Sequence, residues 1–234
     1  MHFHLPKPLH GWREFAGEVG IIVLGVLIAL GAEQLVEAAH WRSEARSFGK
    51  AVDQELGRNL GIYDIILRQR PCVTRRLAEL ERFLADSRMG KQDRLARPIG
   101  SPERYSQYSS VWDNRGAEVT AHLPGDLRSR YGELYDEFAN NDLVRTRERE
   151  VWQDMSQFDQ AEPLDHSDRM HLRALLNRAE YINTITTGNY DFIFKLARPL
   201  GIRPIGGENL IPLPGEESFC KSLLAVRPPA STVL

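Results

Sequence analysis

The chain has 234 residues, with 30 Lys and Arg against 32 Asp and Glu, so its formal net charge is only −2. This balance argues against a nucleic acid as a partner, because a domain that binds nucleic acid carries a basic surface. With 42% hydrophobic and 26% charged residues, the composition indicates a folded protein rather than a disordered one.

An apolar segment near the N-terminus, residues 15–41, predicts a single membrane-spanning helix. Its uninterrupted stretch from Val19 to Ala32 is short for a bilayer core of about 30 Å, but flanking apolar residues lengthen it. Trp12 and Trp41 bracket the segment and would lie about 43 Å apart along a continuous helix. That distance matches the roughly 40–45 Å thickness of a bilayer with headgroups, where indole rings accumulate. The lipid bilayer is therefore the first partner that the sequence predicts.

A cleavable signal peptide is the alternative interpretation of the same segment. Lys7 and Arg13 would form its basic region, and residues 29–31, Ala-Leu-Gly, its small-x-small cleavage site. Glu14 and Glu18 oppose this interpretation, because they place acid where signal peptides carry net positive charge. The helical apolar pattern also continues beyond the cleavage site. We therefore favour an uncleaved anchor.

Small and acidic residues in the span leave two interpretations of its use. The pairs Ala16/Gly20 and Gly25/Ala29 are small-xxx-small steps, which let a second helix approach closely. Glu18 either reaches the headgroup level or pairs with a polar group inside a helix pack. The span is then either a simple anchor or a contact with a second copy or another membrane protein.

Basic residues on the two sides of the span nearly balance, so they do not fix its orientation. The cationic groups are the amino terminus, Lys7 and Arg13 before the span, and Arg42, Arg46 and Lys50 after it. A long domain that follows a span is translocated largely regardless of its charge. Orientation therefore has to be judged from the cysteines.

The chain contains two cysteines, Cys72 and Cys220, each beside an expected helix boundary. A single disulfide between them would fasten a short C-terminal amphipathic segment to the domain. In the chain-entropy model, closing so long a loop stabilises by up to about 4–5 kcal/mol. Because disulfides persist outside the cytoplasm, this pairing would place the domain in the periplasm or outside the cell. The alternative is two ordinary buried thiols, and neither cysteine has a second ligand at zinc spacing.

Behind the span, apolar residues recur every three or four positions, which predicts helices rather than strands. We expect the membrane helix to continue to about Arg70, where Pro71 would end it, and a second helix to cover about 72–88. Gly57 weakens the first of these expectations, since glycine costs about 1 kcal/mol in a helix. Residues 90–102 are polar and carry two prolines, so they predict a loop.

Three more helices are expected in the second half of the chain. The first is short and covers about 106–122. Asp126 is positioned to cap the N-terminus of a longer helix, and its polar middle predicts a break near Asn140. The last begins near Ser167 and ends near Leu200. Antiparallel packing would bury the apolar stripes of these helices, so we predict an all-α fold.

The expected organisation has four parts. A short tail covers residues 1–14, and the transmembrane helix covers 15–41. An α-helical, bundle-like soluble domain covers 42–200, and an irregular C-terminal tail packed on that domain covers 201–234.

Residues 17–30, which read GEVGIIVLGVLIAL, resemble the N-terminal segment of a group of uncharacterised bacterial single-pass membrane proteins. In that group Gly-Glu-(Ile/Val) precedes an apolar run that ends in Gly-(Ile/Val)-Leu-Ile-Ala-Leu. Residues 4–15, HLPKPLHGWREF, are similar to the version found in proteobacterial hypothetical proteins. The resemblance implies a small protein anchored in the bacterial inner membrane, and it carries over no catalytic residue.

Three groups of candidate metal ligands lie at the end of the span or after it. They are Glu33, Glu37 and His40 on one helical face, the pair Glu118 and His122, and the pair Asp168 and His171. A di-iron bundle needs two Glu-x-x-His motifs, and this sequence has one. Near the third pair, Asp165 or Ser167 more simply caps a helix, and Asp168 suits its positive end. We therefore expect no metal and no other cofactor.

Two classes of function remain open. The favoured one is a non-enzymatic binding, sensing or scaffold module at the membrane, because the sequence carries no Gly-rich phosphate loop, GxSxG, HExxH or CxxC motif. Its candidate contact residues are Trp112, Trp152, Arg145 and Arg147, although such tryptophans more often lie in a core. The alternative is a metal-dependent enzyme whose site between helices would use Glu118, His122, Asp168 and His171.

Overall fold

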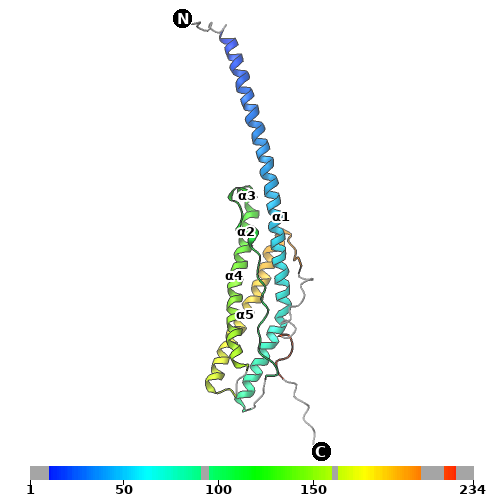
Figure 1. Cartoon of the computed structure of the whole chain (residues 1–234), viewed down its shortest axis with the longest axis vertical. Coiled ribbons are helices and arrows are strands. Elements are labelled where there is room, and N and C mark those ends of the chain that lie inside the picture. Colours follow the sequence, from blue (N-terminus) through cyan, green and yellow to red (C-terminus); the bar gives the residue numbers. More distant parts are fainter. Residues whose placement is uncertain (1–10, 91–94, 160–162, 207–218, 225–234) are drawn as a thin grey trace, which may run out of the picture. The chain divides into compact units, whose positions relative to one another are not determined.

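The computed structural model describes residues 11–90, 95–159, 163–206 and 219–224, and its regular structure there is helical without any strand. The helices are α1 (Trp12–Arg88), α2 (Ser110–Asp113), α3 (Ala117–Ala121), α4 (Gly125–Met155) and α5 (His166–Ala197), with 3-10 turns at Ser156–Phe158 and Arg198–Leu200 (Figure 1). The all-α prediction is confirmed. Most of the expected tails at 1–14 and 201–234 lies outside the described residues.

The chain divides into two compact units. We call Met1–Gly49 with Gly116–Leu123 the N-terminal unit, and Lys50–Arg115 with Pro124–Leu234 the helical domain. Helix α1 contributes its first part to the one and its later part to the other.

In the N-terminal unit, α1 exposes apolar side chains on all sides. Its most apolar window of 18 residues has a mean hydropathy of 2.3, and none of that window is buried. Ile21 is 75% exposed and Leu27 60% exposed. In water such a surface would be strongly unfavourable, at about 25 cal/mol per Å². Within the described part of the chain, α1 alone is long and apolar enough to cross a membrane.

The helical domain is built from the later part of α1 together with α4 and α5. Two contacts between α1 and α4 define the relative direction of these helices. Tyr131 donates a hydrogen bond to Asp53 near the start of the domain, and Arg70 donates to Glu148 further along both helices. Helix α4 therefore runs parallel to α1. Helix α5 runs opposite to both, as Figure 1 shows. The segment between α1 and α2 returns along the domain to make this connection possible, because parallel neighbours cannot be joined by a short turn.

One apolar core holds the domain together. It gathers side chains from α1, α4, α5 and the C-terminal segment, among them Val73, Leu80, Leu84, Val151, Trp152, Met155, Leu172, Leu176, Ile182, Phe219 and Leu223. Most of these side chains are no more than 1% exposed. Burying one such side chain contributes about 1.5–3 kcal/mol, which explains why the apolar stripes of these three helices face one another.

The predicted helix end at Pro71 is wrong. Helix α1 continues through Pro71 to Arg88, so the expected separate helix over 72–88 is the last part of α1. Proline in a helix costs about 3 kcal/mol, because it removes a hydrogen bond and crowds the preceding turn. Here Arg70 and Val73 on either side are buried against the other helices, while Pro71 faces outward. Packing on both sides of the proline offsets its local cost.

Two further helix boundaries differ from the prediction. Helix α4 has no break near Asn140, because the polar middle of α4 faces the other helices: Asn141, Arg145 and Glu148 are all buried. The short helix expected over 106–122 is instead the two separate helices α2 and α3. Pro124, not Asp126, stands at the N-terminal cap of α4.

Candidate functional site

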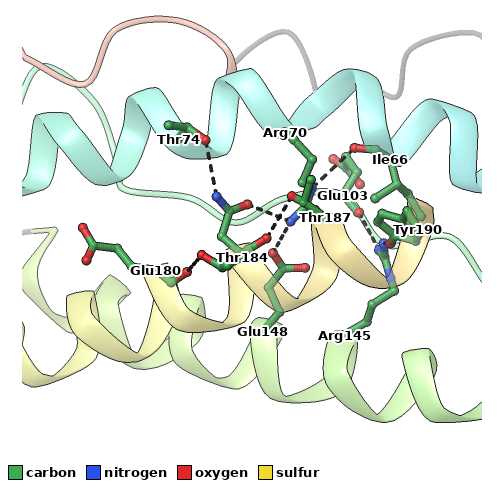
Figure 2. Close-up of polar contacts among 11 residues, drawn as sticks. Ile66, Arg70, Thr74, Glu103, Arg145, Glu148, Glu180, Thr184, Thr187 and Tyr190 are labelled. Carbon is green, nitrogen blue, oxygen red and sulfur yellow. Dashed lines mark hydrogen bonds and ion pairs between the residues drawn. The ribbon is translucent and has the colours of Figure 1, made fainter. Parts of the chain in front are cut away.

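A cluster of buried polar side chains joins α1, α4 and α5 in the middle of the helical domain (Figure 2). Arg70 donates to Glu148 at 2.7 Å and to Asn183 at 3.3 Å. Arg145 donates to the hydroxyl of Tyr190 at 2.8 Å and to the backbone carbonyl of Glu103 at 3.0 Å. These contacts fix the register of the three helices.

This cluster is closed to solvent. Arg70 is 6% exposed, Glu148 5% and Arg145 4%. Removing one partner from such a pair leaves a buried charge uncompensated, so the arrangement is sensitive to substitution. The cluster therefore stabilises the packing of the three helices and is not an accessible binding site.

An open pocket lies elsewhere in the domain, between residues 104–115 and α4. Its volume is about 540 Å³, which lies within the range of small-molecule sites. Tyr135, Phe138 and Trp112 provide its apolar lining, and charged side chains from both walls border it. We take this pocket as the candidate binding site.

Three polar residues at successive turns of α1 hold the wall of this pocket. Glu55 accepts hydrogen bonds from the backbone nitrogens of Val111 at 2.9 Å and Trp112 at 3.4 Å. Asn59 pairs with both backbone groups of Tyr108, at 2.7 and 2.8 Å. Tyr63 accepts from Gln107 at 2.5 Å. A segment without regular structure is thereby fixed in place, because its backbone groups are satisfied by buried side chains.

Buried tyrosines beside the pocket keep their protons. Burial raises the pKa of Tyr135, and its 2.6 Å hydrogen bond to Glu55 raises that pKa further. Burial likewise raises the pKa of Tyr63. Both hydroxyls therefore remain neutral at physiological pH, and Tyr135 serves as a donor to Glu55 rather than as a charged group.

The C-terminal segment 219–224 is fastened to α1. Cys72 and Cys220, the pair considered in the sequence, are joined by a disulfide with a Cα–Cα distance of 5.0 Å. Arg76 donates to the carbonyl of Phe219 at 2.5 Å, and Glu79 accepts from the backbone nitrogen of Leu223 at 2.8 Å. The phenyl ring of Phe219 packs edge-on against Trp152. Besides the disulfide, polar and apolar contacts thus hold the segment against the domain.

The predicted anchor residues lie on α1 within the N-terminal unit. Trp12 is 79% exposed, and Glu18 and Ala29 are exposed as well. Gly20 and Gly25 have no described neighbour within 4 Å of the position that a Cβ would take. Trp41 is half-buried because the ring of His122 stacks on it, with ring centroids 4.8 Å apart. The anchor therefore has a protein contact at its C-terminal end that the sequence did not reveal.

Several of the candidate metal ligands have other partners. His122 stacks on Trp41, and its Nδ1 lies 2.9 Å from the carbonyl of Glu118. Asp168 forms a reciprocal capping box with Asp165 at the start of α5, so the predicted capping role of Asp165 is confirmed. Within the described ranges, no three His, Cys, Asp or Glu side chains are placed to hold a metal ion.

The four candidate contact residues fall into different environments. Trp152 is 1% exposed and belongs to the core, and Arg145 belongs to the buried polar cluster. Trp112 is 8% exposed and borders the pocket, whereas Arg147 is exposed on α4. Glu55 and Asn59 were not predicted as site residues, although polar residues four positions apart on an otherwise apolar helix face are a visible signal.

Comparison with known proteins adds no relative: no family model, curated protein or solved structure matches this chain.

Proposed function

We propose that this protein is a single-pass membrane protein whose helical domain acts as a binding or sensing module outside the cytoplasm. The observation that carries the proposal is the first part of α1, an apolar helix with none of its most apolar window buried. Because an isolated helix satisfies its own backbone, it can lie in lipid without further partners. The resemblance of residues 17–30 to bacterial membrane proteins supports the inner membrane as its location.

The disulfide between Cys72 and Cys220 supports an extracytoplasmic domain. Such bonds form and persist in oxidising compartments and are rare in the cytoplasm. The bond closes a loop with a sequence separation of 148, so it constrains the unfolded chain strongly. The pocket with its fixed wall supports binding as the activity, since a preformed site loses little entropy on binding.

Orientation can be tested by labelling thiols in spheroplasts that produce the full chain, with a maleimide that does not cross the inner membrane. We expect the unaltered protein to resist the reagent until it is reduced, because both cysteines are bonded. A Cys220→Ser variant leaves Cys72 free and serves as the matched control, which should be labelled directly from outside.

Labelling of the Cys220→Ser variant only after the inner membrane is opened would place the domain in the cytoplasm and overturn the proposal. Labelling of the unaltered protein without reduction would show that the disulfide does not form in cells.

A further inference from the structure

Two adjacent arginines of α1 hold the backbone of the C-terminal segment. Arg76 donates to the carbonyl of Phe219 at 2.5 Å and to that of Lys221 at 3.0 Å. Arg75 donates to the carbonyl of Cys220, which lies between them. Three successive peptide carbonyls are thus held by guanidinium groups, so neutral oxygens occupy the place that a carboxylate would take beside an arginine.

The docked segment leaves Arg76 in an unfavourable place. Arg76 is 2% exposed, and its Nη1 has no hydrogen-bond partner in the described part of the chain. Neither Arg75 nor Arg76 forms an ion pair with a described carboxylate. Burial lowers the pKa of Arg76, Glu79 opposes that shift, and the charges of Arg97 and Arg75 reinforce it. Docking therefore keeps a cation away from water without an anionic partner, which opposes docking.

Apolar contacts favour docking, but few side chains of the segment make them. Phe219 and Leu223 are buried, and the other four side chains of residues 219–224 are half-buried or exposed. Ordering the segment costs conformational entropy at every residue, whereas two side chains gain most of the burial. The disulfide offsets this cost, because a tethered segment binds at high effective concentration. We therefore expect docking to depend on the disulfide.

The disulfide is placed where a thiol can reach it. Cys72 and Cys220 are both half-buried, and Arg75 beside them is exposed. Arg75 and Arg76 follow Cys72 by about one turn of α1, and Arg75 contacts the carbonyl of Cys220. Neighbouring cations favour the thiolate form of a cysteine. A disulfide whose leaving thiolate is stabilised in this way is reduced faster.

We propose that the Cys72–Cys220 disulfide is a redox switch, which a protein dithiol reduces and which thereby releases the C-terminal segment from α1. A thiolate of the dithiol bonds to the sulfur of Cys220, and the bond between the two cysteines breaks with its electron pair on Cys72, beside Arg75 and Arg76. The second thiolate of the dithiol then displaces Cys220 from the mixed disulfide. Two electrons pass to the chain, the dithiol becomes a disulfide, and its two protons are available to the two cysteines.

Release uncovers a surface of mixed chemistry on the domain. Phe219 leaves the ring of Trp152, and Leu223 leaves the carboxylate of Glu79. Water then reaches Arg76. The redox state thereby determines whether this surface is available. The switch goes beyond the proposed function, although it uses the disulfide that supports that function.

Hydrogen exchange followed by mass spectrometry tests the release, with the purified full chain in neutral detergent. Exchange in residues 219–224 is compared before and after reduction by dithiothreitol, and in a Cys72→Ser/Cys220→Ser variant that cannot form the bond. We expect exchange in this segment to become faster by about tenfold or more in both cases, because the amide of Leu223 loses its bond to Glu79. Residues 172–182 of α5 should keep their protection.

The rate of reduction tests the role of the arginines. Arg75→Gln removes the exposed cation beside the disulfide, and Arg82→Gln removes an exposed cation two turns further along α1 as the matched control. We expect dithiothreitol to reduce the Arg75→Gln protein about threefold more slowly than the unaltered chain, since the leaving thiolate loses its cation. The Arg82→Gln protein should be reduced at the unaltered rate.

Three results would overturn the proposal. If residues 219–224 stay protected after reduction, their other contacts suffice and the disulfide controls nothing. If α5 loses its protection together with the segment, the bond supports the whole fold and does not act as a switch. Equal rates of reduction for Arg75→Gln and Arg82→Gln would show that Arg75 does not assist the exchange. All three measurements use purified protein, so their failure leaves the orientation determined by thiol labelling in spheroplasts untouched.

Discussion

The two parts of α1 have opposite patterns of side-chain exposure, although they belong to one helix. In the N-terminal unit, large apolar side chains such as Ile21, Ile22 and Leu24 are 75%, 66% and 58% exposed. In the helical domain, polar side chains such as Glu55 and Asn59 are 4% and 0% exposed. The most apolar window of the first part has no buried residue, whereas the later part buries individual polar side chains.

This contrast shows what each part of the helix requires from its surroundings. An apolar helix face in lipid needs no partner, because hydrocarbon is as apolar as leucine. A buried carboxylate or amide needs hydrogen bonds, because an unpaired polar group in a protein interior costs about 1–3 kcal/mol. The first part of α1 can therefore tolerate changes among apolar residues, whereas the later part depends on individual contacts.

Introducing charge into the first part should have the largest effect. Replacing Leu24 and Ile28, which lie one turn apart, with arginine should cost about 5–7 kcal/mol of membrane insertion, at about 2.5–3.5 kcal/mol for each charge. We expect the Leu24→Arg/Ile28→Arg protein to be lost from the membrane fraction after alkaline carbonate extraction. The matched variant Leu24→Ile/Ile28→Leu should stay there. Retention of the arginine variant would show that α1 does not cross the bilayer.

Removing charge from the later part should be nearly as severe. Arg70→Met leaves Glu148 buried without its cation, so we expect a loss of about 3–5 kcal/mol in the free energy of unfolding. Arg173→Met breaks a partly exposed pair with Glu81, whose two side chains are 30% and 43% exposed, and should cost at most about 1 kcal/mol. Chemical denaturation of the full chain in neutral detergent measures both.

Equal losses in these two variants would show that burial of the Arg70–Glu148 pair does not set its contribution. A combined Arg70→Met/Glu148→Leu variant separates the remaining possibilities. It should recover much of the stability, because the uncompensated charge is then gone.

Sequence patterns predicted the parts of this fold that depend on composition and period. The apolar run after Trp12 predicted the exposed helix, and the recurring leucines predicted the packed faces of α1 and α5. Local signals were wrong where a distant contact determines the helix bounds. Pro71 and the polar middle of α4 both predicted a helix end. Both helices continue there, because Arg70 and Arg145 are buried in tertiary contacts.

The pocket could be predicted only in fragments. Trp112 was singled out as a contact residue, but nothing local to it indicates the acceptors that position it. Its partners Glu55 and Tyr135 lie 57 and 23 positions away, and hydrogen bonds over such separations follow from packing rather than from a motif. The wall segment 104–109 has no regular structure, so it also has no period to detect.

Two glycines of α1, one in each part, differ in the same way in how closely other residues approach them. A Cβ added at Gly57, in the later part of α1, would lie 2.6 Å from Cδ1 of Ile205 and 3.0 Å from the carbonyl oxygen of Arg203. The segment after α5 therefore approaches this helix closely, and the nitrogen of Ile205 donates to the carbonyl of Gly57 at 2.8 Å. This approach explains a glycine that the helix pattern alone disfavours. A Cβ at Gly25, in the first part, would meet nothing within 4 Å among the described residues.

Gly57→Val should accordingly cost about 1–3 kcal/mol in the free energy of unfolding, because the larger side chain forces the segment around Ile205 away from α1. Gly25→Val should leave that free energy unchanged, since it alters only a surface that faces outward. Denaturation of both variants, with limited proteolysis after Ile205 as a second readout, measures the difference. If Gly57→Val is as stable as Gly25→Val, the close approach at Gly57 does not constrain the domain, and the two parts of α1 tolerate bulk equally.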